Sequence, residues 1–256
     1  MKRFRFFTLT CALLSGPALF AAKPTPLDLY LLVGQSNMAG RGKLTDADRQ
    51  PDPRILVLNK ENVWVSQGEP LHFDKPEMVG VGLGFTFAKL VADKTPGVTV
   101  GLIPCAVGGT PLSRWKPGAD LYEQALVRAR IALKNGQLKG ILWHQGESES
   151  GSETNANAYA KNLAEVALGF RRDLNAPDVP FIAGELGEFL YTRAANKSPY
   201  AHVVNQQINS LPAFLPHSAI VSSAGLGHKG DELHFSAEAQ KEFGRRYFKA
   251  LQSLQK

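Results

Sequence analysis

The stretch from Leu29 to Gly42, LYLLVGQSNMAGRG, constrains this chain more than any other. Its apolar first part stops at Gly34, and small or polar residues follow. A short run of β-preferring side chains ended by glycine predicts a buried strand that enters a tight turn. Ser36 then lies just past the carboxyl end of the strand, which is where open α/β sheets bind ligands.

The same residues also fit a simpler interpretation. Ser36 and Asn37 could form only a turn, or the N-cap of the next helix, because serine and asparagine both favour such positions. The stretch alone leaves both interpretations open. The residues that follow the other predicted strands are needed to choose between them.

The first 22 residues have the pattern of a secretory signal peptide. Lys2, Arg3 and Arg5 precede an apolar segment, Phe6 to Leu14, and small residues follow up to Ala22. The apolar segment is too short for a comfortable transmembrane span. We therefore expect export to the periplasm or the medium, cleavage near Ala21 or Ala22, no membrane association afterwards, and one domain over residues 23–256.

Charge and cysteine content narrow the class of protein. The formal charge of +6 includes three signal-peptide cations, so the mature chain carries about +3. The other Lys and Arg residues are scattered among acids, which indicates a solvated surface and no nucleic-acid patch. Without Cys11 only Cys105 remains, so no internal disulfide is expected and the fold must depend on its core.

Apolar runs and amphipathic segments alternate along the chain. This alternation predicts a parallel sheet covered by helices on both faces. The expected strands are 29–33, 54–58, 63–66, 98–103, 140–143, 179–183 and 219–222, and the expected helices are 82–93, 121–134, 157–174, 199–211 and 236–254. Two long loops, 67–81 and 187–198, are expected to shape a groove.

The residues at the strand ends could carry out acyl transfer. Ser36 is the candidate nucleophile, and its hydroxyl needs a neighbouring base. His234 is the candidate base, and Asp231, three residues earlier, could fold back to orient the imidazole. A D-x-x-H pair alone is equally typical of a surface turn.

Donors for an oxyanion are also present. The backbone N–H of Ser36 is one candidate, the bare backbone of Gly108-Gly109 is a second, and the side-chain amide of Gln145 is a third. Simpler roles are a tight turn for the glycines and a loop hydrogen bond for Gln145. The surroundings of Ser36 are not the G-x-S-x-G nucleophile elbow of α/β-hydrolases, because Met38 stands where that motif has its second glycine.

Four blocks in this order resemble a known family. They are Gly34-Gln35-Ser36-Asn37-Met38, Pro104-Cys105-Ala106-Val107-Gly108-Gly109, Trp143-His144-Gln145-Gly146-Glu147-Ser148 and Asp231-Glu232-Leu233-His234-Phe235. The chain resembles the sialate O-acetylesterase-like group, which includes the acetyl xylan esterases of carbohydrate esterase family six, within the SGNH hydrolase superfamily. The resemblance covers essentially the whole mature chain.

The resemblance implies a three-layer α/β/α, flavodoxin-like fold with a parallel central sheet, and a serine esterase without metal or other cofactor. Ser36 would be the nucleophile, His234 the base and Asp231 its partner. The N–H groups of Ser36 and Gly109 and the amide of Gln145 would form the oxyanion hole. The expected partner is an acetylated carbohydrate; the oligomeric state is left open.

Some residues keep two interpretations. Glu147 could be an alternative acid for the histidine or an anchor for the loop that presents Gln145, and we favour the anchor. Arg114 and Trp115 could line a sugar groove together with Asn37, or be a packed aromatic and its cation.

The function expected from these patterns is removal of O-acetyl groups from a glycan by an exported serine esterase. Acetylated xylan and O-acetyl sialic acid are both consistent substrates. The alternatives are another short-chain serine hydrolase on the same fold and an inactive glycan-binding protein. A series of acyl chain lengths distinguishes the first alternative, and glycan binding without acetate release distinguishes the second.

Overall fold

A seven-stranded sheet forms the middle layer of the protein in the computed structural model, which describes residue 1 and residues 26–193 and 197–255. The predicted signal peptide, apart from Met1, lies outside the described residues. The strands are β1 (Leu27–Gly34), β2 (Ile55–Leu58), β3 (Trp64–Val65), β4 (Val100–Pro104), β5 (Gly136–His144), β6 (Phe181–Gly184) and β7 (Ser218–Val221). All seven strands were predicted from the apolar runs.

The strand order is β3-β2-β4-β1-β5-β6-β7. Every neighbouring pair is parallel except β2 and β3, which form an antiparallel hairpin at one edge. Without this hairpin the remaining strands have the 2-1-3-4-5 order of flavodoxin-like folds, with β1 where the order reverses. Ligands bind at this reversal in open α/β sheets, beyond the carboxyl ends of the strands.

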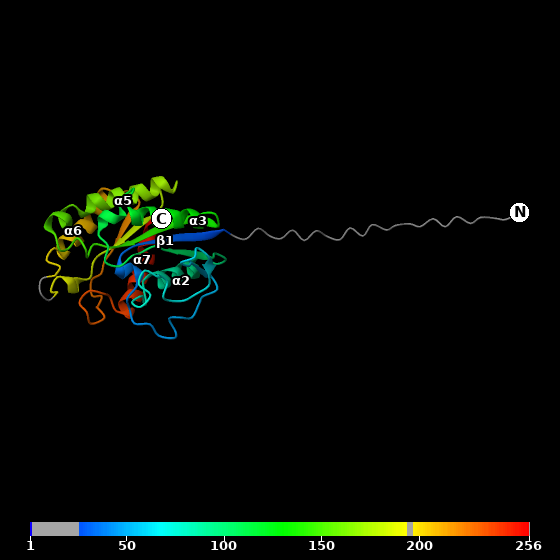
Figure 1. Cartoon of the computed structure of the whole chain (residues 1–256), viewed down its shortest axis with the longest axis horizontal. Coiled ribbons are helices and arrows are strands. Elements are labelled where there is room, and N and C mark those ends of the chain that lie inside the picture. The colour runs from blue at the N-terminus through cyan, green and yellow to red at the C-terminus, as the bar shows by residue number, and fades with distance from the viewer. Residues whose placement is uncertain (2–25, 194–196, 256) are drawn as a thin grey trace.

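Helices cover both faces of the sheet (Figure 1). They are α1 (Ser36–Ala39), α2 (Gly84–Lys94), α3 (Asp120–Ala132), α4 (Glu153–Asn157), α5 (Tyr159–Asp173), α6 (Ala201–Ser210) and α7 (Ala237–Leu254), with 3₁₀ turns η1 (Leu112–Trp115), η2 (Glu188–Leu190) and η4 (Leu211–Ala213). One core cluster joins the sheet to α3, α5 and α6, and a second joins it to α1, α2 and α7. The structure is therefore the expected three-layer α/β/α sandwich.

Alternation of side chains along β1 explains why one strand serves both cores. Leu29, Leu31 and Val33 belong to the first cluster, whereas Tyr30 and Leu32 belong to the second. All five are at most 2% exposed, as expected for a central parallel strand that is buried on both faces. Burial on both sides fixes the end of β1, and with it the position of the residues that follow.

Two local features differ from the sequence prediction. The strand expected at 140–143 begins earlier, at Gly136, where a Cβ atom would lie 2.1 Å from Leu27 O. Glycine is thus needed there for close approach of two strands. The short helix α4 was not predicted, because five residues are too few to show helical periodicity.

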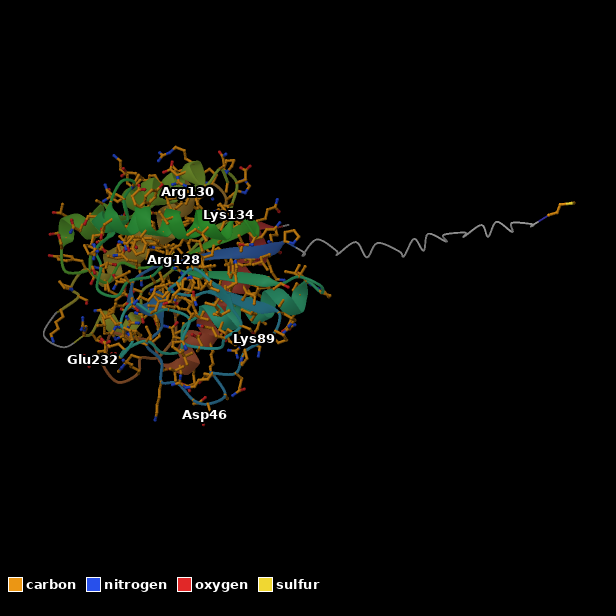
Figure 2. All side chains as sticks on the ribbon, turned by 45° about the vertical axis from the view of Figure 1, so that its right-hand side comes forward. Asp46, Lys89, Arg128, Arg130, Lys134 and Glu232 are labelled. Carbon is orange, nitrogen blue, oxygen red and sulfur yellow. The ribbon has the colours of Figure 1, made fainter. Side chains whose placement is uncertain are left out.

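Charged side chains lie on the outside of both helical layers, as Figure 2 shows for Lys89 on α2, Lys134 beyond α3 and Asp46 in a loop. Among the described residues, none of the helices is long and apolar enough to cross a membrane.

Candidate active site

The turn after β1 holds Ser36 at the carboxyl edge of the sheet. Gly34 has φ 133°, and a Cβ atom there would lie 2.1 Å from His144 O, so only glycine allows β1 and β5 to end this close together. Gln35 N–H donates to the same carbonyl at 2.9 Å. Ser36 then begins α1 and is 7% exposed.

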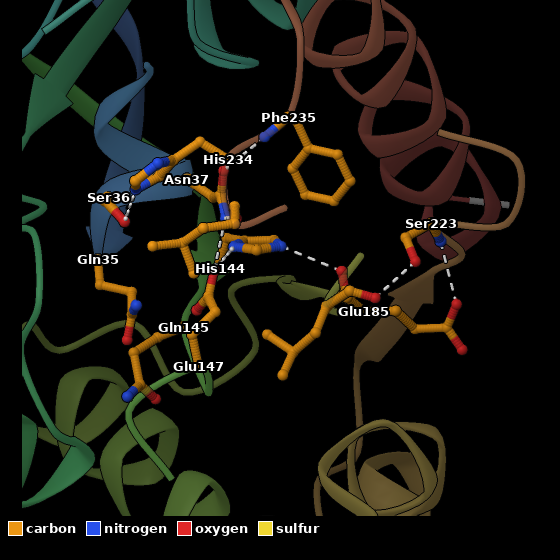
Figure 3. Close-up of polar contacts among 12 residues, drawn as sticks. Gln35, Ser36, Asn37, His144, Gln145, Glu147, Glu185, Ser223, His234 and Phe235 are labelled. Atoms are coloured by element: carbon orange, nitrogen blue, oxygen red, sulfur yellow. Dashed lines mark hydrogen bonds and ion pairs between the residues drawn. The ribbon is translucent and has the colours of Figure 1, made fainter. Parts of the chain in front are cut away.

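His234 reaches Ser36 from the loop that precedes α7. Its Nε2 lies 3.0 Å from Ser36 Oγ, and its Nδ1 lies 2.7 Å from Asp231 Oδ2 (Figure 3 shows Ser36 and His234). With Nδ1–H donating to the carboxylate, Nε2 is free to accept the serine proton. The structure thus brings together three residues that the sequence analysis selected from positions up to 198 residues apart.

Asp231 is held by the turn that it begins. Its Oδ1 accepts hydrogen bonds from the N–H groups of Leu233, at 3.0 Å, and His234, at 2.8 Å. Burial pushes the pKa of Asp231 upward, but the hydrogen bonds from the His234 backbone and imidazole and from Leu233 outweigh it and lower the pKa to about 2. The carboxylate is therefore ionised and can stabilise an imidazolium.

A cavity of about 350 Å³ opens over Ser36. Its lining residues are Gln35, Ser36, Arg41, Lys75, Met78, Gly108, Gly109, Glu147, Ser148, Arg193, Leu233 and His234. Among the described residues, the N–H groups of Ser36 and Gly109 have no hydrogen-bond partner. These are two of the predicted oxyanion donors, and both belong to residues that line the cavity.

The structure corrects the expected position of the Gln145 amide. The side chain is fully buried, and its Nε2 donates to Thr110 O at 3.1 Å and to a carboxylate oxygen of Glu149. Tyr159 donates its hydroxyl to Gln145 Oε1 at 3.0 Å. One amide hydrogen therefore supports the loop after Gly109, the other binds Glu149, and Gln145 does not line the cavity.

Asn37 lies behind the cavity and binds Glu147, which lines it. Asn37 Nδ2 donates to Glu147 Oε1 at 2.6 Å and to Leu233 O at 3.1 Å, and Asn37 Oδ1 accepts from Phe235 N at 3.1 Å. Asn37 is 1% exposed, so it holds the backbone on both sides of His234 and does not line a groove. Glu147 contacts this anchor, whereas Asp231 is the acid that contacts His234.

A second histidine lies next to Glu147 (Figure 3). His144 Nε2 lies 3.0 Å from Glu185 O, and its Nδ1 lies 3.8 Å from Glu147 Oε1. Burial lowers the pKa of His144, although the negative charge of Glu147 partly opposes this. Its ring packs edge-on against Phe235 and Phe243, so it is a core residue.

Arg114 and Trp115 lie elsewhere. Trp115 is fully buried and packs edge-on against Trp143, and its indole N–H donates to Thr110 Oγ1 at 3.1 Å. Arg114 is exposed and pairs with Asp120. Of the two interpretations, the structure shows the packed aromatic, and the expected groove role of Trp115 is wrong because none of the ring reaches solvent.

Sequence reasoning missed a buried ion pair beside the cavity. Arg41 Nη2 lies 2.7 Å from Asp74 Oδ2, and each side chain is 1% exposed. The only sequence signals were a cation just after the serine motif and the unusual length of the loop 67–81. Among the described residues there is no group of three or more His, Cys, Asp or Glu side chains that could hold a metal ion.

Comparison with known proteins identifies the family of this chain. The family described as carbohydrate esterase, sialic acid-specific acetylesterase matches residues 26–253. A probable carbohydrate esterase from Arabidopsis thaliana is 33% identical over 238 residues, which are 86% of this chain and 88% of the plant protein. The crystal structure of that protein has a TM-score of 0.80 at 32% identity and covers 90% of this chain and 99% of its own.

Two more distant structures share the fold. NanS has a TM-score of 0.74 at 19% identity, covering 90% of this chain and 98% of its own. A carbohydrate acetylesterase from Xanthomonas citri has a TM-score of 0.66 at 19% identity, and the match covers 89% of this chain and 56% of that protein. From the family match and the plant relative, this chain belongs to the carbohydrate esterase family of sialic acid-specific acetylesterases and is a carbohydrate acetylesterase, a carboxylic ester hydrolase.

Proposed function

We propose that this acetylesterase uses Ser36 as a nucleophile and passes through an acetyl-enzyme intermediate. The observation that supports the proposal is the continuous chain from Ser36 Oγ through the His234 imidazole to the Asp231 carboxylate, with contacts of 3.0 and 2.7 Å. The serine and the base both line the cavity, so a bound ester reaches them together.

The reaction divides into two steps of acyl transfer. Ser36 Oγ attacks the acetyl carbonyl carbon while His234 Nε2 takes the hydroxyl proton, and the oxyanion accepts hydrogen bonds from Ser36 N–H and Gly109 N–H. The bond from the carbonyl carbon to the sugar oxygen breaks, and His234 returns the proton to that oxygen. Water then attacks the acetyl carbonyl carbon while His234 takes its proton; the bond from that carbon to Ser36 Oγ breaks, His234 returns the proton to Ser36 Oγ, and acetate leaves.

Replacement of Ser36 tests the mechanism. Ser36→Ala should lower acetate release by roughly 10⁴-fold or more while the melting temperature stays close to that of the wild type. Ser148 is a matched control, since it lines the same cavity and its hydroxyl only donates to Gln35 Oε1 at 3.1 Å. Ser148→Ala should keep most of the activity. A Ser36→Ala protein with near-wild-type turnover would exclude the serine mechanism.

The cavity favours O-acetyl sialic acid over acetylated xylan as the substrate. Lys75 and Arg193 line it, and neither has a carboxylate partner within the described part of the chain. The third cation, Arg41, is already paired. An acetylated sugar that carries a carboxylate could pair with Lys75 or Arg193, whereas a neutral xylan offers no such partner.

Charge removal at the cavity rim tests the substrate. Lys75→Gln with Arg193→Gln should lower kcat/KM on O-acetyl sialic acid by about tenfold or more, and change it little on a neutral aryl acetate. Arg114→Gln is the matched control, because Arg114 is exposed, outside the cavity and paired with Asp120. Equal losses on both esters would contradict recognition of a carboxylate. A series of acyl chain lengths, with acetate cleaved fastest, would separate this enzyme from other short-chain hydrolases.

We also propose that the enzyme is exported. The support is the sequence of residues 1–22 alone, with its cations, apolar segment and small residues. The amino-terminal sequence of protein recovered from a secretion-competent host tests this. A mature chain that begins near Lys23 supports export, and an uncleaved chain in the cytoplasm contradicts it.

A further inference from the structure

A buried carboxylate holds the loop that supplies the second backbone donor. Asp74 Oδ2 accepts the Gly108 N–H at 2.7 Å and also accepts from Arg41 Nη2 at 2.7 Å. Asp74 lies in the long loop between β3 and α2, and Gly108 lies in the loop after β4. A single oxygen atom thus joins two loops that are 34 residues apart.

Arg41 connects the same carboxylate to the segment that carries the nucleophile. It follows α1 by two residues, and its Nη1 donates to Gly40 O at 2.8 Å. The guanidinium is therefore fixed against its own backbone while it binds Asp74. The result is a rigid link from the end of the Ser36 helix, through Arg41 and Asp74, to Gly108.

The link lies directly against the reacting groups. A Cβ atom at Gly108 would lie 2.6 Å from Arg41 Nη2, 3.1 Å from Asp74 Oδ2 and 3.4 Å from Ser36 Cβ. The ion pair and Ser36 therefore both lie close to the position that a side chain at residue 108 would take, so a larger residue there would displace the Arg41 guanidinium. Gly109, with its N–H free of partners in the described residues, comes next in the chain.

The charges of the pair also affect an oxyanion. A lone carboxylate beneath Gly108 would repel the negative oxygen that forms on a substrate at Ser36. Burial raises the pKa of Asp74, but the hydrogen bonds from Arg41 and Gly108 and the charge of Arg41 outweigh it, so the pKa stays lowered and the group ionised. Arg41 lines the cavity and Asp74 does not, so the positive charge of Arg41 offsets the negative charge of Asp74 on the cavity side.

We propose that Arg41 and Asp74 are positioning residues of the oxyanion hole. Asp74 holds the Gly108 N–H so that the next N–H, that of Gly109, faces the cavity, and Arg41 cancels the charge of the carboxylate that does so. The inference rests on the proposed serine mechanism, because an oxyanion forms at this place only if Ser36 attacks. It assigns a function to a buried ion pair, which is an arrangement that by itself adds little stability.

Asp74→Leu is the central test, because it keeps about the size of the side chain and removes the oxygen that accepts the Gly108 N–H. We expect kcat for acetate release to fall by about ten- to a hundredfold with KM changed by less than about threefold, since removal of a whole oxyanion donor costs about 10²- to 10³-fold. A small alkyl boronic acid, which forms a tetrahedral anion on the serine, should bind more weakly by a similar factor. A purely structural role would not weaken the boronate in proportion to kcat.

Asp48→Leu is the matched control. Asp48 is also a buried carboxylate in an ion pair, with Lys241 at 2.6 Å, but it lies outside the cavity. It should lower the melting temperature without changing kcat or boronate affinity. If Asp74→Leu does not fold, Arg41→Met with Asp74→Leu removes both charges together, still leaves the Gly108 N–H without its acceptor, and should show the same loss of kcat.

The outcomes separate the two proposals. If Ser36→Ala is inactive while a folded Asp74→Leu protein keeps wild-type kcat and boronate affinity, the positioning role is wrong and the serine mechanism stands. A rise in KM with unchanged kcat would also overturn the positioning role, because it would place the pair in substrate binding. If Ser36→Ala is active, the serine mechanism itself is wrong.

Discussion

Two pairs of a histidine and a carboxylate lie within this fold, and each pair is three residues apart in the sequence. In the first pair, Asp231 Oδ2 lies 2.7 Å from His234 Nδ1, and the other ring nitrogen, Nε2, lies 3.0 Å from Ser36 Oγ. In the second, Glu147 lies 3.8 Å from His144, whose Nε2 meets the Glu185 carbonyl. Both pairs meet near the end of β1.

The difference lies in what the second ring nitrogen contacts. His234 is 7% exposed and faces the cavity, so its Nε2 can exchange a proton with a hydroxyl and a substrate. His144 is fully buried, and its Nε2 contacts the Glu185 carbonyl oxygen. That oxygen carries no proton, so it cannot take the place of a nucleophile. A histidine–acid spacing therefore indicates catalysis only when a nucleophile lies on the open side of the ring.

The largest effect expected from this comparison comes from the same substitution at both histidines. His234→Gln should lower kcat by roughly 10⁴- to 10⁶-fold, because the general base is lost. His144→Gln should keep kcat within about tenfold, because the glutamine amide can still donate to Glu185 O. Steady-state acetate release on one ester measures both. Similar losses for the two variants would show that the buried pair takes part in proton transfer.

A smaller effect is expected when the carboxylates are neutralised. Asp231→Asn should lower kcat by roughly 10²- to 10⁴-fold, since the amide no longer fixes the tautomer or stabilises the imidazolium. Glu147→Gln should change kcat by less than about tenfold, because the glutamine oxygen can still accept from Asn37 Nδ2.

The same pair of variants resolves which acid serves the catalytic histidine. Single-turnover acylation measured by the acetate burst is the sharper readout, because it isolates the step in which His234 takes the proton. A greater loss in Glu147→Gln than in Asp231→Asn would reverse the assignment drawn from the geometry.

The sequence patterns predict the layers of this fold and one of its two histidine pairs. Apolar runs predicted every strand, and the D-x-x-H motif predicted a local turn whose Asp231 Oδ1 accepts from the next backbone N–H groups. These features depend on residues close together in the sequence, so the periodicity and spacing of the residues are enough to predict them.

Contacts between distant loops were not predictable in the same way. The bond from Asn37 to Leu233 O spans 196 residues, and that from Gly108 to Asp74 spans 34 residues with no fixed spacing. Gln145 shows the same limit: its presence after β5 was correctly noted, but its direction depends on Glu149 and Tyr159, which bury the amide. Side-chain direction in a loop follows from such tertiary contacts.

The smallest expected effect concerns stability against pH. Burial lowers the pKa of His144, so the unfolded state binds a proton more readily than the folded state as the pH falls below about 6.5. This group therefore makes the folded protein less stable on mild acidification, with Glu147 as the facing charge that limits the loss. For Asp231, with its pKa lowered to about 2, the contribution is present above about pH 4 and is lost as the pH falls through about 2.

His144→Gln should therefore flatten the fall in unfolding free energy between pH 7 and pH 5. Urea unfolding at a series of pH values measures the slope. His202→Gln is the control, because this histidine is exposed on α6 and folding changes its hydration little. If His144→Gln keeps the full wild-type slope, the ring is not held neutral by burial. The contrast between the buried pair, His144 with Glu147, and the pair at the cavity, His234 with Asp231, would then rest on geometry alone.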